Sequence, residues 1–247
     1  MPTGSDVIAA RTMNFLYIWL DLGFLALFFL LLLWVKRYQA IIVGILGGVL
    51  YFIVDYGIFY LLLGTRVVEG AGPGWFLLWL SVSYGFTNLV WIWLWLDRDR
   101  HAAEWSIFVM TGWLAVAILS TTLGSGTAQI SITRGTAQYH GVMAALLFVG
   151  YGLLCAYNLK QKDPAKRAPL LWILAIGILV QFSWEAVLAM TGIRNPAWNT
   201  LVINSVLETN MGMPYLYLIH RAVTKRWSEA LRPVQSWGKA AGEGGEA

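Results

Sequence analysis

Seven long apolar segments, separated by short polar turns, restrict what this chain can fold into. A helix needs about 20 apolar residues to cross the hydrocarbon core of a bilayer, and these segments lack the period of two expected of barrel strands. The sequence therefore predicts an all-α, polytopic membrane protein with seven transmembrane helices. These helices are expected over residues 15–35, 41–63, 75–96, 104–123, 139–159, 169–191 and 198–221.

Composition agrees with a membrane protein and indicates its orientation. Of the 247 residues, 58% are hydrophobic and only 12% are charged, whereas soluble domains carry about 25% charged residues. Basic residues gather at 36–37, 98–100, 160–167 and after residue 220, and the positive-inside rule assigns these turns to the cytoplasm. The N-terminus is then outside and the C-terminus cytoplasmic, in a multi-pass protein of the cell membrane. The basic residues left on the opposite side are Arg11, Arg66, Arg134 and Arg194.

The domain organisation follows from the same pattern. Residues 1–227 are predicted to form a single seven-helix transmembrane domain, and residues 228–247 a disordered cytoplasmic tail rich in Gly, Ala and Glu. Because the basic residues lie in turns and in this tail, the net charge of +4 does not indicate a nucleic-acid partner. The expected surroundings are a lipid bilayer, and no pattern specifies an oligomeric state.

Three carboxyl groups lie well inside predicted helices: Asp55, Glu185 and Glu208. A charge at this depth costs several kcal/mol unless it faces a cavity or a partner, so each residue is a candidate catalytic group. The alternative is a hydrogen-bonded contact between helices, which contributes only about 0.6–2 kcal/mol in membranes. Few basic residues lie inside the spans, so burial is expected to favour the protonated acids as proton donors. We expect the three acids to share one cavity.

Polar and aromatic side chains share helix faces with these acids, and Pro214 is expected to kink the seventh helix beyond Glu208. These polar and aromatic side chains are predicted to bind an apolar or amphipathic small molecule. No HExxH, CxxC or histidine-rich pattern is present, so neither a metal nor a cofactor is expected. His140, at the start of the fifth helix, is either an interfacial anchor or part of the cavity mouth. The predicted binding residues are Tyr51, Tyr84, Asn88, Trp91, His140, Gln181, Trp184, Asn204, Ser205 and Tyr215.

Short matches between the two halves suggest an internal repeat. The segment from Ser83 to Asn88 resembles the segment from Ser205 to Asn210 in its Ser, Thr and Asn positions. Helix two also reads Phe-x-x-Asp and then Gly-x-Arg, while helix six reads Phe-x-x-Glu and then Gly-x-Arg. This pattern is typical of two parallel three-helix units joined by a linker helix, a 3+1+3 arrangement in which Asp55 and Glu185 are equivalent.

The whole chain distantly resembles the small integral-membrane terpene cyclases of meroterpenoid and indole-diterpene pathways. The similarity rests on Tyr38 and Asp55 in helix two, Tyr84–Gly85 in helix three, the Tyr-His-Gly that opens helix five, and Glu208-x3-Gly212-x4-Tyr217 in helix seven. It implies a metal-independent isomerase in which Glu208 or Asp55 protonates an epoxide or alkene of a prenyl chain. An aromatic wall would then guide the cation through ring closure.

A transporter is the second interpretation of the same residues. In a 3+1+3 carrier, Asp55, Glu185 and Glu208 would bind a cation or couple the movement of a solute to protons. An apolar, aromatic-lined cavity reached from the lipid would favour the enzyme. A polar route that opens to one aqueous face would favour the carrier.

Overall fold

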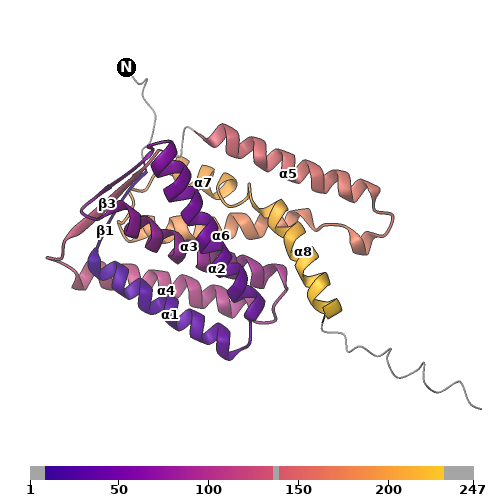
Figure 1. Cartoon of the computed structure of the whole chain (residues 1–247), viewed down its shortest axis with the longest axis horizontal. Helices are drawn as coiled ribbons and strands as arrows, with labels where there is room; N and C mark the ends of the chain where they lie inside the picture. Colours follow the sequence, from indigo (N-terminus) through magenta and orange to yellow (C-terminus); the bar gives the residue numbers. More distant parts are fainter. Residues whose placement is uncertain (1–8, 136–138, 231–247) are drawn as a thin grey trace, which may run out of the picture.

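The computed structural model describes residues 9–135 and 139–230 and is mostly helical (Figure 1). A small sheet lies at one end of the helices, and α8 runs toward the other end. The elements in chain order are β1 (Ala9–Asn14), α1 (Phe15–Trp34), α2 (Tyr38–Phe52), the π-helix η1 (Ile53–Leu62), β2 (Arg66–Glu69), α3 (Pro73–Leu96), α4 (Ala102–Leu123), β3 (Gln129–Arg134), α5 (His140–Lys160), the 3-10 turn η3 (Pro164–Lys166), α6 (Leu170–Met190), α7 (Trp198–Leu207) and α8 (Met213–Ala230).

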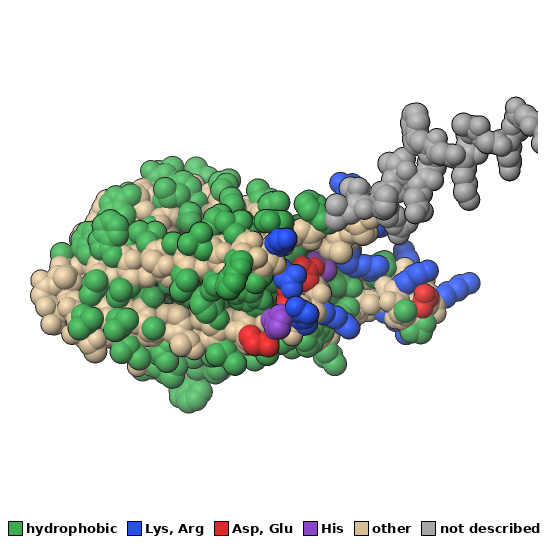
Figure 2. All heavy atoms as spheres, turned by 90° about the horizontal axis from the view of Figure 1, so that it is seen from below, with side chains coloured by type: hydrophobic (Ala, Val, Ile, Leu, Met, Phe, Trp, Pro, Cys, Tyr) green, Lys and Arg blue, Asp and Glu red, His purple; other side chains and the backbone are tan. Residues whose placement is uncertain are grey.

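Six of these helical segments are long and apolar enough to cross a membrane, which confirms a multi-pass membrane protein. They are α1, α2 together with η1, α3, α4, α5, and α6 with the turn before it. Their outer faces expose large hydrophobic side chains such as Leu30, Leu62 and Phe148, which suits contact with lipid. Figure 2 shows hydrophobic side chains along the body of the molecule and Lys and Arg side chains gathered toward one end.

The seventh predicted helix is not continuous. The prediction was one kinked helix over residues 198–221, but α7 ends at Leu207 and α8 begins at Met213. Turns occupy residues 208–212 between them. Pro214 lies in the first turn of α8, where its missing N–H is tolerated. Glu208 therefore lies in a break between two half-helices rather than within a continuous helix.

A three-stranded antiparallel sheet forms from segments that were predicted as loops. Its strand order is β1-β3-β2, and the sequence interpretation as an all-α chain missed it. The backbone of Arg11 also forms an isolated antiparallel β-bridge with that of Arg194, on the outer side of β1. The register sets Arg66 opposite Arg134, just as Arg11 stands opposite Arg194. The sheet therefore gathers four arginines at one end of the helices.

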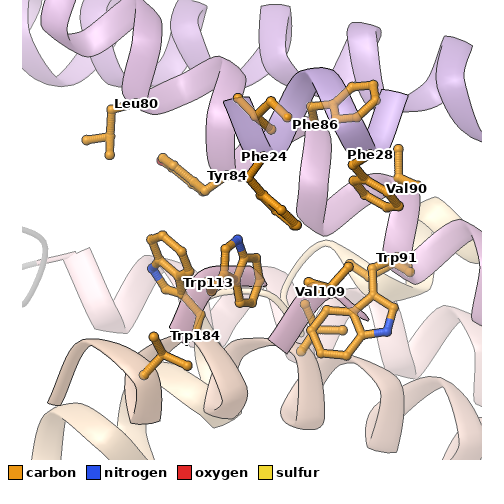
Figure 3. Close-up of a cluster of buried hydrophobic side chains, with 14 of the residues drawn as sticks. Phe24, Phe28, Leu80, Tyr84, Phe86, Val90, Trp91, Val109, Trp113 and Trp184 are labelled. Atoms are coloured by element: carbon orange, nitrogen blue, oxygen red, sulfur yellow. The ribbon is translucent and has the colours of Figure 1, made fainter. Parts of the chain in front are cut away.

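Helix α3 is the central helix, and most of its length is buried. Its aromatic side chains contact rings from α1, α4 and α6, and Figure 3 shows Tyr84, Trp113 and Trp184 facing one another. On the opposite side α3 packs tightly on α2. A Cβ atom added to Gly85 would lie 3.0 Å from the Cα of Gly48 and 3.1 Å from the carbonyl oxygen of Gly47. Small residues permit this close approach of two membrane helices.

The contact between α2 and α3 yields a stability prediction. The substitution Gly85→Leu forces the two backbones apart, because the side chain has no space to enter, and should lower the free energy of unfolding by at least about 1–3 kcal/mol. Thermal unfolding of the detergent-solubilised protein measures this change. Gly23→Leu on α1 is the matched control, since a Cβ there meets nothing within 4 Å. An equal loss in both variants would contradict the packing described.

Candidate functional site

A cavity of about 340 Å³ lies among the helices and reaches the sheet, and its volume falls in the range of small-molecule sites. Its wall is mostly apolar and aromatic. Leu50 of α2, Leu89 and Ile92 of α3, and Leu216 and Ile219 of α8 contribute to it. Eight of the predicted site residues line this cavity: Tyr51, Asp55, Tyr84, Asn88, Gln181, Trp184, Glu208 and Tyr215.

Asp55 is the centre of a buried ion-pair cluster. It is the third residue of η1. It accepts hydrogen bonds from Arg66 Nη2 at 2.8 Å and from Arg134 Nη2 at 3.1 Å. The Tyr84 hydroxyl donates to its other oxygen at 2.6 Å. Asp55 and Arg66 are each 2% exposed, and the Arg66 guanidinium also lies 4.3 Å above the Phe59 ring. Buried charges persist when they are paired and hydrogen-bonded in this way.

Glu185 has a similar set of partners but does not line the main cavity. Arg194 Nη1 donates to one of its oxygens, and Arg11 Nη2 lies 3.8 Å from the other. Asn204 Nδ2 also donates to Glu185, at 3.3 Å. Glu185 faces a smaller pocket of about 210 Å³ that Arg194 and Trp198 help to form. The expectation that all three acids share one cavity is therefore wrong for Glu185.

These clusters correct a second expectation, that the acids lie far from cations. The four arginines assigned to outer loops are instead buried and reach the acids through the sheet. Their charges affect one another as well. Burial and the neighbouring charge of Arg134 lower the pKa of Arg66. Burial also opposes the charge on Arg134, but the charge of Asp55 raises the pKa of Arg134 above its ordinary value.

Glu208 differs from the other two acids. Gln181 Nε2 donates to its Oε2 at 3.1 Å, and no Lys or Arg in the described part of the chain lies within ion-pair distance of it. Thr209 Oγ1 donates to Gln181 Oε1 at 2.7 Å, which directs the amide nitrogen of Gln181 toward the carboxyl groups. The same nitrogen lies 3.2 Å from Glu185 Oε1, so Gln181 joins Glu208 to the second cluster.

Four predicted binding residues lie outside the cavity lining. The Trp91 indole donates to Ser106 at 2.7 Å, and Asn204 belongs to the Glu185 cluster. The Ser205 hydroxyl donates to the carbonyl of Leu201 within its own helix. His140 begins α5 and does not contribute to the cavity wall. We therefore correct their placement on the wall of a shared cavity.

The sequence interpretation missed several residues that shape the site. Arg11, Arg66 and Arg134 line the cavity, and the only signal for any of them was the recurring Gly-x-Arg after helices two and six. Asp21 of α1 is a further buried acid outside the cavity lining. It is 1% exposed and accepts a hydrogen bond from the Trp79 indole at 3.0 Å.

Neither candidate metal ligands nor comparisons with known proteins indicate which reaction the site supports. Within residues 9–135 and 139–230, no three His, Cys, Asp or Glu side chains are placed to hold a metal ion together. No family model, curated protein or solved structure matches this chain.

The Asp55 cluster gives a prediction about folding. Asp55→Asn leaves two buried guanidinium groups without their counter-charge, and breaking a buried pair in this way costs about 3–5 kcal/mol. The expected result is a large drop in the thermal unfolding midpoint. Asp163→Asn is the control, because Asp163 is exposed and pairs only with Lys166, and its midpoint should match wild type. A wild-type midpoint for Asp55→Asn would show that the cluster is dispensable for stability.

Proposed function

We propose that the protein is a metal-independent membrane isomerase that cyclises a prenyl or epoxyprenyl chain, with Glu208 as the acid. The observation that carries this proposal is a carboxyl group without a cationic partner on the wall of a largely apolar cavity. An uncompensated carboxyl group in such surroundings favours its protonated form, and a general acid must hold a proton to deliver. Asp55 is a weaker candidate for this role because it faces two guanidinium groups.

In this mechanism Glu208 transfers its proton to an epoxide oxygen or an alkene carbon. Gln181 then stabilises the carboxylate through the hydrogen bond it already makes. Tyr51, Tyr84 and Trp184 line the same cavity, and in this mechanism their rings stabilise the carbocation as the alkene electron pairs close the rings. The cyclised cation releases a proton that restores the acid, so that substrate and product have the same composition. Exclusion of water protects the cation from early capture.

The rim of the cavity supports entry from the lipid. Leu50 of α2 and Ile219 of α8 both line the cavity, and both are more than half exposed on the outer surface of the helices. Side chains of this kind at a cavity opening are compatible with a substrate that arrives dissolved in the bilayer. They do not form the polar route that a carrier of hydrophilic solutes needs.

One observation favours the transporter as a second candidate. Carriers commonly bind their substrates at discontinuous helices near the middle of the membrane, and Glu208 occupies the break between α7 and α8. In that interpretation Glu208 binds a proton or cation, and the turn at 208–212 moves. Proton-coupled or labelled-cation uptake into proteoliposomes that depends on Glu208, without any conversion of prenyl epoxides, would select the carrier over the enzyme.

We also propose that α7 and α8 together form a seventh span, with the N-terminus outside. The turns before α2, before α4 and before α6 then lie on the cytoplasmic side with the end of α8, and these turns carry the exposed basic residues. The four arginines at the opposite end are buried against carboxylates, so they add little exposed charge there.

A 3+1+3 repeat accounts for the paired clusters. We infer that Asp55, Arg66 and Arg134 correspond to Glu185, Arg194 and Arg11, because each acid pairs with an arginine that follows it and with one from the strand of the other half. Arg66 follows Asp55 by 11 residues, whereas Arg194 follows Glu185 by 9. The π-helix η1 accommodates such extra residues within a helix. In the repeat, Phe86 of α3 corresponds to Glu208. Glu208 therefore has no acidic counterpart in the first half, unlike Asp55 and Glu185, which correspond to each other.

The catalytic role of Glu208 leads to a direct test. Glu208→Gln keeps the size and the hydrogen-bonding capacity of the side chain but removes the proton to be transferred. Conversion of the terminal epoxides of farnesol and geranylgeraniol should fall by about 10²- to 10⁴-fold, the usual contribution of a general acid. Product is measured by gas chromatography and mass spectrometry as a new peak of unchanged mass. Glu104→Gln, at an exposed carboxyl on α4, should retain full activity, and equal activity of the two variants would refute the assignment.

The proposed topology can be tested by cysteine labelling. In a Cys155→Ser background, an impermeant maleimide should label Ser125→Cys in intact cells, because this exposed residue lies at the sheet end. Lys162→Cys lies in the turn between α5 and α6 and should react only after the cells are permeabilised. The reverse labelling pattern would place the N-terminus in the cytoplasm.

A further inference from the structure

The sheet end of the cavity holds guanidinium N–H groups that lack hydrogen-bond partners. Arg11 is 1% exposed and lines the cavity, yet its Nε and Nη1 atoms have no partner in the described structure. Arg66 Nη1 and Arg134 Nε, also on buried side chains that line the cavity, are likewise unpartnered. A buried donor without a partner is costly, and more so when it is charged, so each of these groups requires an explanation.

Positive charge also exceeds negative charge at this end. Four guanidinium groups, those of Arg11, Arg66, Arg134 and Arg194, face two carboxylates in the paired clusters. When Glu208 carries its proton, two positive charges are left without compensation in a low-dielectric region. This excess of positive charge affects Arg11 in particular. Burial and the like charges of Arg194 and Arg134 lower the pKa of Arg11 to about 9. A bound anion would relieve both the charge excess and the unpaired donors.

The rest of the cavity has the opposite character. Away from the sheet, α2, α3 and α8 contribute aliphatic side chains, among them Leu89, Ile92 and Leu216. Two other lining residues, Leu50 and Ile219, are also exposed on the outer surface of the helices. A ligand that matches this wall has a charged head at the sheet and an apolar tail that points toward the lipid.

We propose that the cavity binds an amphipathic prenyl compound whose head is an anionic oxygen group, a carboxylate or a phosphate, held by Arg11 together with Arg66 and Arg134. The inference deepens the proposed function, and it rests on that function for the prenyl nature of the tail. Guanidinium groups bind both kinds of oxyanion through short, charge-assisted hydrogen bonds. Arg11 also lies beside Glu185, which Gln181 links to Glu208. A head bound at Arg11 therefore fixes the position of the tail relative to the acid.

Three probes with one tail and different heads test this proposal: geranylgeranyl monophosphate, geranylgeranoic acid and geranylgeraniol. Binding to the full-length protein in a neutral detergent is measured by calorimetry. At least one of the two anions should bind tenfold or more tightly than the alcohol, and the better anion identifies the head chemistry. Equal affinities for all three probes, or no binding of any, would overturn the proposal without recourse to a variant.

Variants of Arg11 then test whether this arginine binds the anionic head. Arg11→Gln should bring the affinity for the anions down to that for the alcohol and leave the affinity for the alcohol unchanged. Arg221→Gln is the matched control, because Arg221 donates to Tyr157 outside the cavity, and it should keep the preference for anions. A preference that survives in Arg11→Gln would reflect general surface charge and would overturn the role of Arg11. If Arg11→Gln does not fold, Arg11→Lys should retain a weaker preference.

The two proposals fail in distinguishable ways. Turnover of neutral prenyl epoxides that depends on Glu208, with no preference for anionic heads, would overturn the anionic head alone. Preferential binding of the anions without conversion of any prenyl epoxide would overturn the cyclase activity and leave the anion site intact.

Discussion

The compensation of charge inside an apolar bundle is the constraint on which the rest of this structure depends. Asp55 and Glu185 lie on helices, and the arginines that neutralise them come from strands and turns at one end. An isolated charge in such surroundings costs many kcal/mol, so the helices and the sheet stabilise one another. Arg11 on β1 and Arg134 on β3 reach the acids on α6 and η1. The ion pairs thereby fix how the helix ends meet.

Packing then determines where the cavity lies. Helix α3 approaches α2 closely through Gly85 and contacts α1, α4 and α6 through aromatic rings. Between membrane helices there is no hydrophobic driving force of the kind that acts in water, so such fitted contacts and buried hydrogen bonds hold the helices together. On the other side of α3, the break between α7 and α8 replaces a continuous helix surface. The cavity lies between this break and residues of α2, η1 and α3, and Glu208 lines it.

The contrast among the three acids carries the functional argument. Asp55 and Glu185 are each paired with buried arginines, and such pairs join the helices to the sheet. Glu208 has a hydrogen bond from Gln181 and lies in an irregular segment. Irregular backbone at membrane depth is tolerated where it lines a cavity. An acid without a counter-ion next to an apolar cavity is suited to proton transfer, and the surplus of guanidinium N–H groups at the far end is suited to an anionic head.

The sequence by itself determined the helical, membrane-spanning character of this chain and pointed to Asp55, Glu185 and Glu208. Length and apolarity decide whether a segment can span a bilayer, and these are local properties, so the boundaries of α1 to α6 were predicted to within about three residues when α2 and η1 are taken together. The change to a π-helix at Ile53 was not predicted. Tyr51, Gln181 and Trp184 were likewise placed near acids by helical spacing alone, whereas the contact of Tyr84 with Asp55 joins two different helices. Only the tertiary structure decided that Arg11, Arg66, Arg134 and Arg194 turn inward. It also decided that three loops form a sheet and that the seventh helix breaks at Glu208. These features depend on partners up to 183 residues apart in the chain, as in the pairing of Arg11 with Arg194, and no local pattern of residues specifies which distant charge a buried group will meet.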